Sequence, residues 1–98
     1  MKVVYLMDKK IEHLKIRQIE LKKEISENLD LLMGTINRSP AMMNYGLTTK
    51  IDGKTVSRYV RKGLVPVVKK MTDRHKRVRE MIKELSDVNW ELLKLESG

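Results

Sequence analysis

The sequence predicts a mainly α-helical protein with a β-hairpin, in which two long helices (about 7–33 and 64–95) flank the hairpin (about 45–60). Apolar residues repeat at heptad spacing in both helical segments, and an Asp-Gly pair divides a segment of alternating apolar and polar residues. With 98 residues and 4% aromatic content, the chain is expected to form a single domain (1–98) with a small core. We therefore expect an antiparallel helical hairpin that forms a homodimer.

The first predicted helix, 7–33, has the spacing of a coiled-coil seam. Seam residues follow one another at intervals of four and three positions from Met7 to Leu32. Asp8 is expected to cap the start, because a carboxylate accepts from free backbone N–H groups there. Gly34 is expected to stop the helix.

The second predicted helix, 64–95, repeats the same spacing from Leu64 to Leu92. Pro66 requires the regular helix to start close to it, since proline is tolerated in the first turn. Asn89 lies on the seam between apolar residues, where a buried polar side chain can fix register. The residues expected to pair the helices or the dimer are Ile11, Leu14, Leu21, Ile25, Val78, Ile82, Leu85, Asn89 and Leu92.

The segment between the helices predicts a hairpin with a two-residue turn at Asp52-Gly53. Such a type I′ turn needs positive φ at both positions, which Asp and Gly tolerate best. Residues 35–44 are expected to be a connector without a strand. The register that follows pairs Ile51 with Lys54, Thr49 with Val56, Leu47 with Arg58 and Tyr45 with Val60.

Positive charge is concentrated in the middle of the chain. Residues 35–79 carry 12 basic and two acidic residues, against a net charge of +8 for the whole sequence. Phosphate neutralisation needs such a local excess, and a two-stranded ribbon or a helix can enter a DNA groove. The expected nucleic-acid contacts are Lys50, Lys54, Arg58, Tyr59, Arg61, Lys62, Lys69, Lys70, Arg74 and Arg77.

Within this set, Lys50, Lys54 and Tyr59 are expected to contact a groove, and the others the phosphate backbone. A solvated basic face, stabilised by pairs such as Asp73 with Arg77, is the structural alternative. An acidic protein surface would attract the same cations.

Several classes of site are not expected. The chain has no cysteine, and its two histidines, His13 and His75, lie far apart in the sequence. No glycine-rich phosphate loop is present, and no serine has a visible base partner, so no catalytic residue, metal or cofactor is expected. The apolar runs are too short for a membrane span or a signal peptide, so we expect a cytoplasmic protein without a membrane partner.

Four stretches resemble an uncharacterised prokaryotic family of short basic helical proteins that are often encoded near transposases. They are Leu32 to Ile36, Tyr45 to Thr48, Asp52 to Val60 (with the run GKTVSRYV), and the tail from Ile82 to Lys94 (with ELSDVNWELLK). The resemblance covers about residues 32–95 and implies a mobile-element context with nucleic acid as a partner. Many relatives carry a cysteine-rich insertion before the hairpin, which residues 37–44 of this chain lack.

Together, these features predict a non-catalytic nucleic-acid-binding accessory protein of a mobile element, acting through a basic hairpin and helix start. A second class stays open: a helical interaction module, either a scaffold or an inhibitor, that docks on an acidic partner surface.

Overall fold

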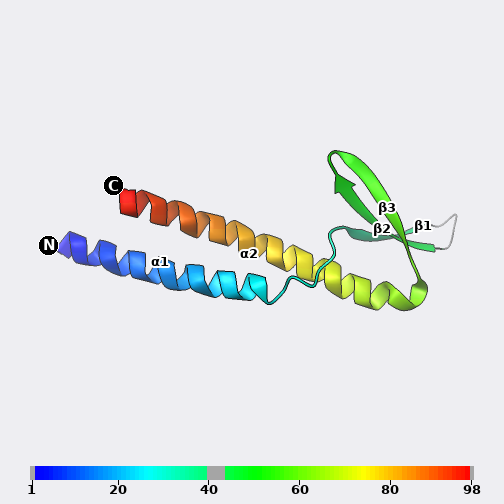
Figure 1. Ribbon diagram of the computed structural model, residues 1–98, viewed down its shortest axis with the longest axis horizontal. Helices are drawn as coiled ribbons and strands as arrows, with labels where there is room; N and C mark the ends of the chain where they lie inside the picture. Colours follow the sequence, from blue (N-terminus) through cyan, green and yellow to red (C-terminus); the bar gives the residue numbers. More distant parts are fainter. Residues whose placement is uncertain (1, 40–43, 98) are drawn as a thin grey trace. The chain divides into compact units, whose positions relative to one another are not determined.

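The computed structural model describes residues 2–39 and 44–97, and the side chains of 8–38 and 44–97. It confirms a mainly helical protein with a β-hairpin (Figure 1). The elements in chain order are α1 (Lys2–Ser26), β1 (Thr35–Ser39), β2 (Asn44–Ile51), β3 (Lys54–Val60), a 3₁₀ turn (Lys62–Leu64) and α2 (Val65–Ser97).

The chain divides into two compact units. The helical unit comprises Met1–Asn28 and Val78–Gly98, and the sheet unit comprises Leu29–Arg77. Helix α2 is continuous and contributes its first 13 residues, 65–77, to the sheet unit and its remainder to the helical unit.

In the helical unit, α1 and the last part of α2 pack antiparallel, because Lys15 pairs with Glu96 while Arg17 pairs with Glu84 (Figure 1). The apolar faces of the two helices pack against each other, as heptad spacing predicts. The core consists of buried Leu21, Val88 and Leu92, with Ile11, Leu14, Met81 and Leu85 partly buried around it.

The first helix differs from its prediction at both ends. Helix α1 starts at Lys2 instead of about residue 7, and Asp8 lies inside it instead of capping it. It ends at Ser26, so the predicted end at 33 with a stop at Gly34 is wrong. The Ser26 hydroxyl donates to the Lys23 carbonyl at 2.7 Å, and the Asn28 amide donates to the Glu24 carbonyl at 2.7 Å. The Asn28 amide thus satisfies a carbonyl of the last helical turn, and the Lys23 carbonyl also accepts from the Glu27 N–H at 3.1 Å.

Residues 29–33, predicted as helix, instead form a non-helical segment bonded to the first part of α2. The Leu32 N–H donates to the Met71 carbonyl at 3.2 Å. The Arg74 guanidinium donates to the Asp30 carbonyl. The heptad spacing therefore continues to Leu32 although the helix ends at Ser26.

Strands β2 and β3 form the predicted hairpin in the predicted register. Asp52 and Gly53 both have positive φ, 50° and 77°, as the two-residue turn requires. All four predicted pairs are confirmed: Ile51 with Lys54, Thr49 with Val56, Leu47 with Arg58 and Tyr45 with Val60.

A third strand corrects the prediction of a connector over 35–44. Strand β1 pairs antiparallel with β2, from Thr35 opposite Thr48 to Ser39 opposite Asn44, and the sheet order is β1-β2-β3. Residues 40–43 of the predicted connector lie outside the described residues. Pairing with β1 satisfies the backbone groups on the second edge of β2, which a lone hairpin would leave open.

Gly34 makes the entry into β1 possible. Its φ is 137°, and a Cβ at this position would lie 2.6 Å from the Thr48 carbonyl oxygen. Only glycine adopts this conformation and this close approach without strain.

Helix α2 agrees with its prediction within two residues at each end. Pro66 is its second residue, where no intrahelical N–H bond is lost. The preceding 3₁₀ turn closes with the Leu64 N–H donating to the Arg61 carbonyl at 2.9 Å.

Candidate functional site

The net charge of the protein resides in the sheet unit. Leu29–Arg77 contains 11 basic and three acidic residues, a net charge of +8, whereas the helical unit contains ten of each sign. A long-range field of one sign therefore originates from the sheet unit alone.

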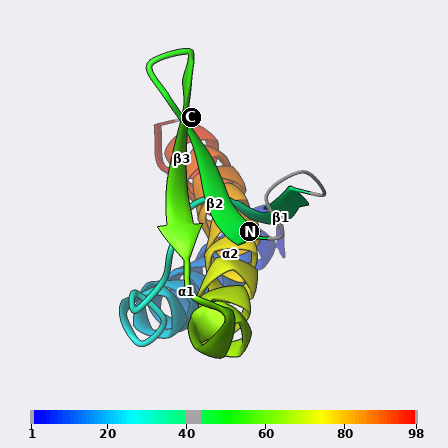
Figure 2. The same ribbon diagram turned by 90° about the vertical axis from the view of Figure 1, so that its right-hand side faces the viewer.

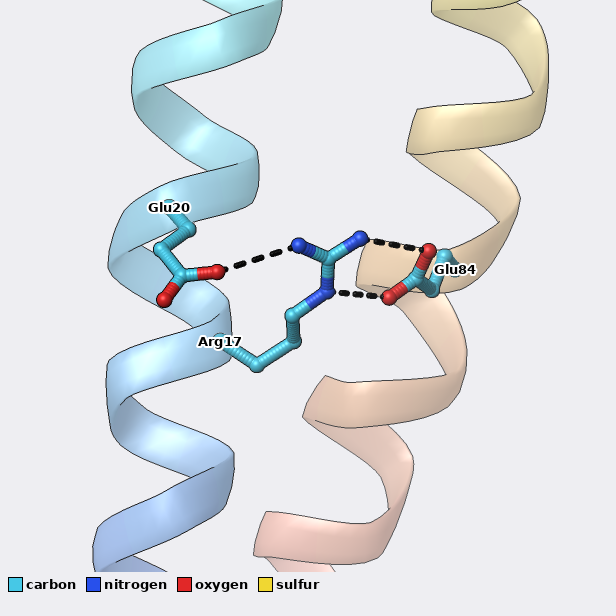
Figure 3. A network of polar contacts seen from close by, with 3 residues as sticks. All are labelled: Arg17, Glu20 and Glu84. Carbon is cyan, nitrogen blue, oxygen red and sulfur yellow. Dashed lines mark hydrogen bonds and ion pairs between the residues drawn. The ribbon is translucent and has the colours of Figure 1, made fainter.

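Several charged side chains in the helical unit pair with one another. Figure 3 shows Arg17 donating to Glu20 at 3.1 Å and, through two nitrogens, to both carboxylate oxygens of Glu84. This hydrogen bonding raises the pKa of Arg17 and lowers the pKa of Glu84. Further ion pairs among the described residues of this unit include Lys15–Glu96, Lys83–Glu80 and Lys94–Glu91.

Cations of the sheet unit are not paired in this way. Over residues 29–39 and 44–77, no cation forms an ion pair. Asp73 therefore does not bridge to Arg77, and a solvated basic face stays an alternative without the support of this pair. Arg74 donates to the Asp30 carbonyl, and Arg38 lies 5.7 Å over the Tyr45 ring. The other nine cations are exposed: Lys50, Lys54, Arg58, Arg61, Lys62, Lys69, Lys70, Lys76 and Arg77.

The hairpin presents cations on both of its faces. Lys50 lies on the outer face, the sheet face that also carries Thr48, Thr55, Ser57 and Tyr59 in the observed register. Lys54 and Arg58 lie on the opposite, inner face.

Side chains of the hairpin are buried only at its base. Leu47 and Val60 are buried there, whereas Ile51 and Val56 towards the turn are 47% and 38% exposed. Figure 2 shows the turn end of β2 and β3 extending away from the first part of α2. Both faces of this end are therefore accessible to a partner.

The first part of α2 carries the second group of cations. Lys69 and Lys76 border a hollow of about 290 Å³ that also involves Thr35, Thr72 and Asp73. Lys70 and Arg77 are seven residues apart and so lie on a shared helix face. Lys76 belongs to this group although the sequence analysis did not include it among the expected contacts.

Arg61 and Lys62 lie between these two groups in the chain, where β3 leads into α2. Lys62 lines a hollow of about 210 Å³ together with Arg38, Asn44, Tyr45, Tyr59 and Val60. The predicted contacts thus lie on the β2–β3 hairpin, on the 3₁₀ turn that follows it and on the start of α2, all within the sheet unit.

The residues expected to pair helices occupy different environments. Leu21, Val78 and Leu92 are buried, and Ile11, Leu14, Ile25 and Leu85 are partly buried. Ile82 is 50% exposed and lies outside the core. Asn89 is exposed and accepts a hydrogen bond of 2.6 Å from the Gln18 amide, which is also a seam residue. Val88 and Met81, on the row beside the seam, complete the core.

A second feature of the sheet unit was missed from the sequence. Asn37 lies opposite Gly46, and Gly46 lies opposite Tyr59, so the three form one row across the outer face. A hollow of about 280 Å³ lies over this row. Asn37 was assigned to a connector, and no local signal joins it to Tyr59; only the pairing of β1 with β2 brings the two together.

No protein-family model matches the chain, and neither a curated protein nor a solved structure is found to be similar to it. Within the described residues, no helix has the length and hydrophobicity that crossing a membrane requires.

Proposed function

We propose that the sheet unit binds nucleic acid through its phosphates and that the protein is a non-catalytic accessory protein. The observation that supports this most directly is the set of nine exposed cations in the described part of the unit that form no ion pair and, unlike Arg38, no contact with an aromatic ring. Lysines and arginines that neutralise phosphates release condensed counterions, and this release drives association. The mobile-element context is what the family resemblance implies.

The arrangement of the cations favours an extended polyanion over a small one. They are distributed along the ribbon, the following turn and the start of α2, and not gathered around one cavity. A nucleic-acid backbone presents charges at regular intervals and can engage such a series together.

The test is the salt dependence of binding. Fluorescence anisotropy with labelled duplex and single-stranded DNA of about 20 nucleotides, at about 50 to 400 mM potassium chloride, gives the slope of log affinity against log salt. Contacts from all nine cations would give a duplex slope of about −8, and each lost contact reduces its magnitude by about 0.9. A slope near zero would reject the proposal.

The double variant Lys54→Gln/Arg58→Gln is expected to reduce the magnitude of the duplex slope by about 2. Lys22→Gln with Lys23→Gln is the matched control, because both lysines are exposed in the helical unit and the change of net charge is identical. An equal effect of both variants would show that net charge, and not the ribbon, determines binding. Polyglutamate of similar length binding as tightly as nucleic acid would favour the acidic-protein alternative instead.

We further infer that the helical unit forms the homodimer. Ile82, Trp90 and Leu93 on α2 are 50%, 60% and 57% exposed, and the balanced charge of the unit imposes no net repulsion between copies. Sedimentation equilibrium measures the stoichiometry. Leu93→Glu is expected to give a folded monomer, and a wild-type monomer would overturn the dimer.

A further inference from the structure

The outer face of the sheet contains a gap between an amide and an aromatic ring. Directly opposed residues of antiparallel strands project to the same face, so Asn37, Gly46 and Tyr59 lie in one row. Glycine in the middle of the row has no side chain to fill the space between its neighbours.

This gap is a measurable hollow, named here the Gly46 hollow. Its volume is about 280 Å³, and its lining includes Asn37, Asn44, Gly46, Ser57 and Tyr59. A Cβ at Gly46 would lie 3.2 Å from the Ser57 hydroxyl and 3.6 Å from the Arg58 carbonyl oxygen. Because the φ of Gly46 is not positive, the backbone does not require glycine here. The absence of a side chain at this position leaves the hollow open.

The side chains around the hollow suit a flat, neutral ring with polar edges. Tyr59 is 68% exposed, so its ring is accessible for stacking. The Asn37 amide donates to the Thr48 hydroxyl at 2.8 Å, which fixes its orientation and leaves its carbonyl oxygen able to accept a further bond. Aromatic side chains with nearby amides are the groups that stack on a nucleobase and bond its edge.

A second hollow adjoins the first and shares Asn44 and Tyr59 with it, among other residues. It is the hollow of about 210 Å³ that Lys62 also lines. A lysine beside the stacking residue is suited to a phosphate, so one nucleotide can engage both hollows. The outer sheet face then recognises the base while Lys62 holds the backbone.

We propose that the Gly46 hollow binds an unpaired nucleobase of a single-stranded nucleic acid, stacked on Tyr59. Bases in a duplex are covered on both faces by their neighbours, so a base must be unpaired or flipped out to contact a sheet surface. This proposal rests on the proposed function and specifies which form of nucleic acid the sheet unit prefers.

Removal of the ring and filling of the hollow test the proposal separately. Tyr59→Thr retains strand propensity but loses the ring, and Gly46→Val fills the hollow without removing any polar group. Each is expected to lower affinity for single-stranded DNA or RNA about tenfold and to leave duplex affinity within about twofold. Tyr59→Phe, which keeps the ring, is expected to bind within about twofold of the wild type.

Thr55→Val is the matched control, since Thr55 is exposed on the same face but does not line the hollow. Far-UV circular dichroism establishes that each variant is folded. Binding measurements with single-stranded DNA and with single-stranded RNA show which of the two supplies the base.

A fully abasic strand of equal length provides the decisive comparison. It keeps every phosphate but has no base, so Tyr59→Thr should no longer weaken its binding. If Tyr59→Thr weakens abasic, duplex and single-stranded ligands equally, or none of them, the proposal is overturned. Unchanged salt slopes in these variants would leave the phosphate contacts of the proposed function standing, so the two failures are distinguishable.

Discussion

Leu21→Ala tests the packing of the helical unit. Leu21 is fully buried, at 0% exposure, and it contacts a core whose other buried members are Val88 and Leu92. Replacement by alanine removes three carbon atoms from this core. At about 0.8 kcal/mol per buried carbon, the transfer contribution alone is about 2.4 kcal/mol.

A residual cavity adds to this cost, and buried leucine-to-alanine changes reach about 5 kcal/mol when the site cannot collapse. The residues around Leu21, such as Leu14 and Leu85, are only partly buried and can move inwards. We therefore expect a loss of about 2.5–3.5 kcal/mol. A chain of 98 residues has roughly 5–15 kcal/mol of stability in total, so the variant should be much easier to unfold.

Urea unfolding followed by circular dichroism at the helical band gives the free energy of unfolding by linear extrapolation. Ile19→Ala is the matched control, because Ile19 lies two residues away on the same helix and is 66% exposed. Its expected effect is within about 0.5 kcal/mol. If the two variants differ by less than about 1 kcal/mol, Leu21 does not occupy the core described above.

Two further predictions concern the sheet unit and the charge pairs. Gly34→Ala should lower the free energy of unfolding by at least about 2 kcal/mol, because φ is positive and the new Cβ would contact the Thr48 carbonyl. Gly63→Ala is the control, because the space around Gly63 is open, and its melting temperature should lie within a few degrees of the wild type. Equal melting temperatures for the two would contradict this. The hydrogen bond from Arg17 lowers the pKa of Glu84, so its stabilisation is present above the ordinary glutamate pKa of about 4.3 and is lost as pH falls through the lowered value. Melting temperatures from acid to neutral pH should thus show a smaller acid-induced decrease for Glu84→Gln, and no further change when Glu84→Gln is added to Arg17→Gln.

The hairpin and the second helix were predictable because local chemistry determines both. Asp52-Gly53 favours one turn geometry, and a two-residue turn fixes the register of every pair that follows. Pro66 marks the start of α2 by excluding an earlier helical turn. The concentration of cations in the sheet unit was also visible from the sequence, since charge does not depend on folding.

The end of the first helix was not predictable from periodicity. Heptad spacing continues to Leu32, but the helix ends at Ser26, where the Ser26 and Asn28 side chains bond carbonyls of its last turn. Leu32 then donates its N–H to Met71, far along the chain. An apolar repeat identifies residues that favour burial, but it does not identify the surface against which they pack.

By itself, the sequence determined the hairpin register, the extent of α2 and the segment that carries the positive charge, because each follows from neighbouring residues. Only the tertiary structure decided that 35–39 is a strand and that Asn37, Gly46 and Tyr59 form a row. Strand β1 is short and polar, and its backbone hydrogen bonds are made with β2, so nothing local favours it. A surface assembled from three strands exists only when long-range pairing places them side by side.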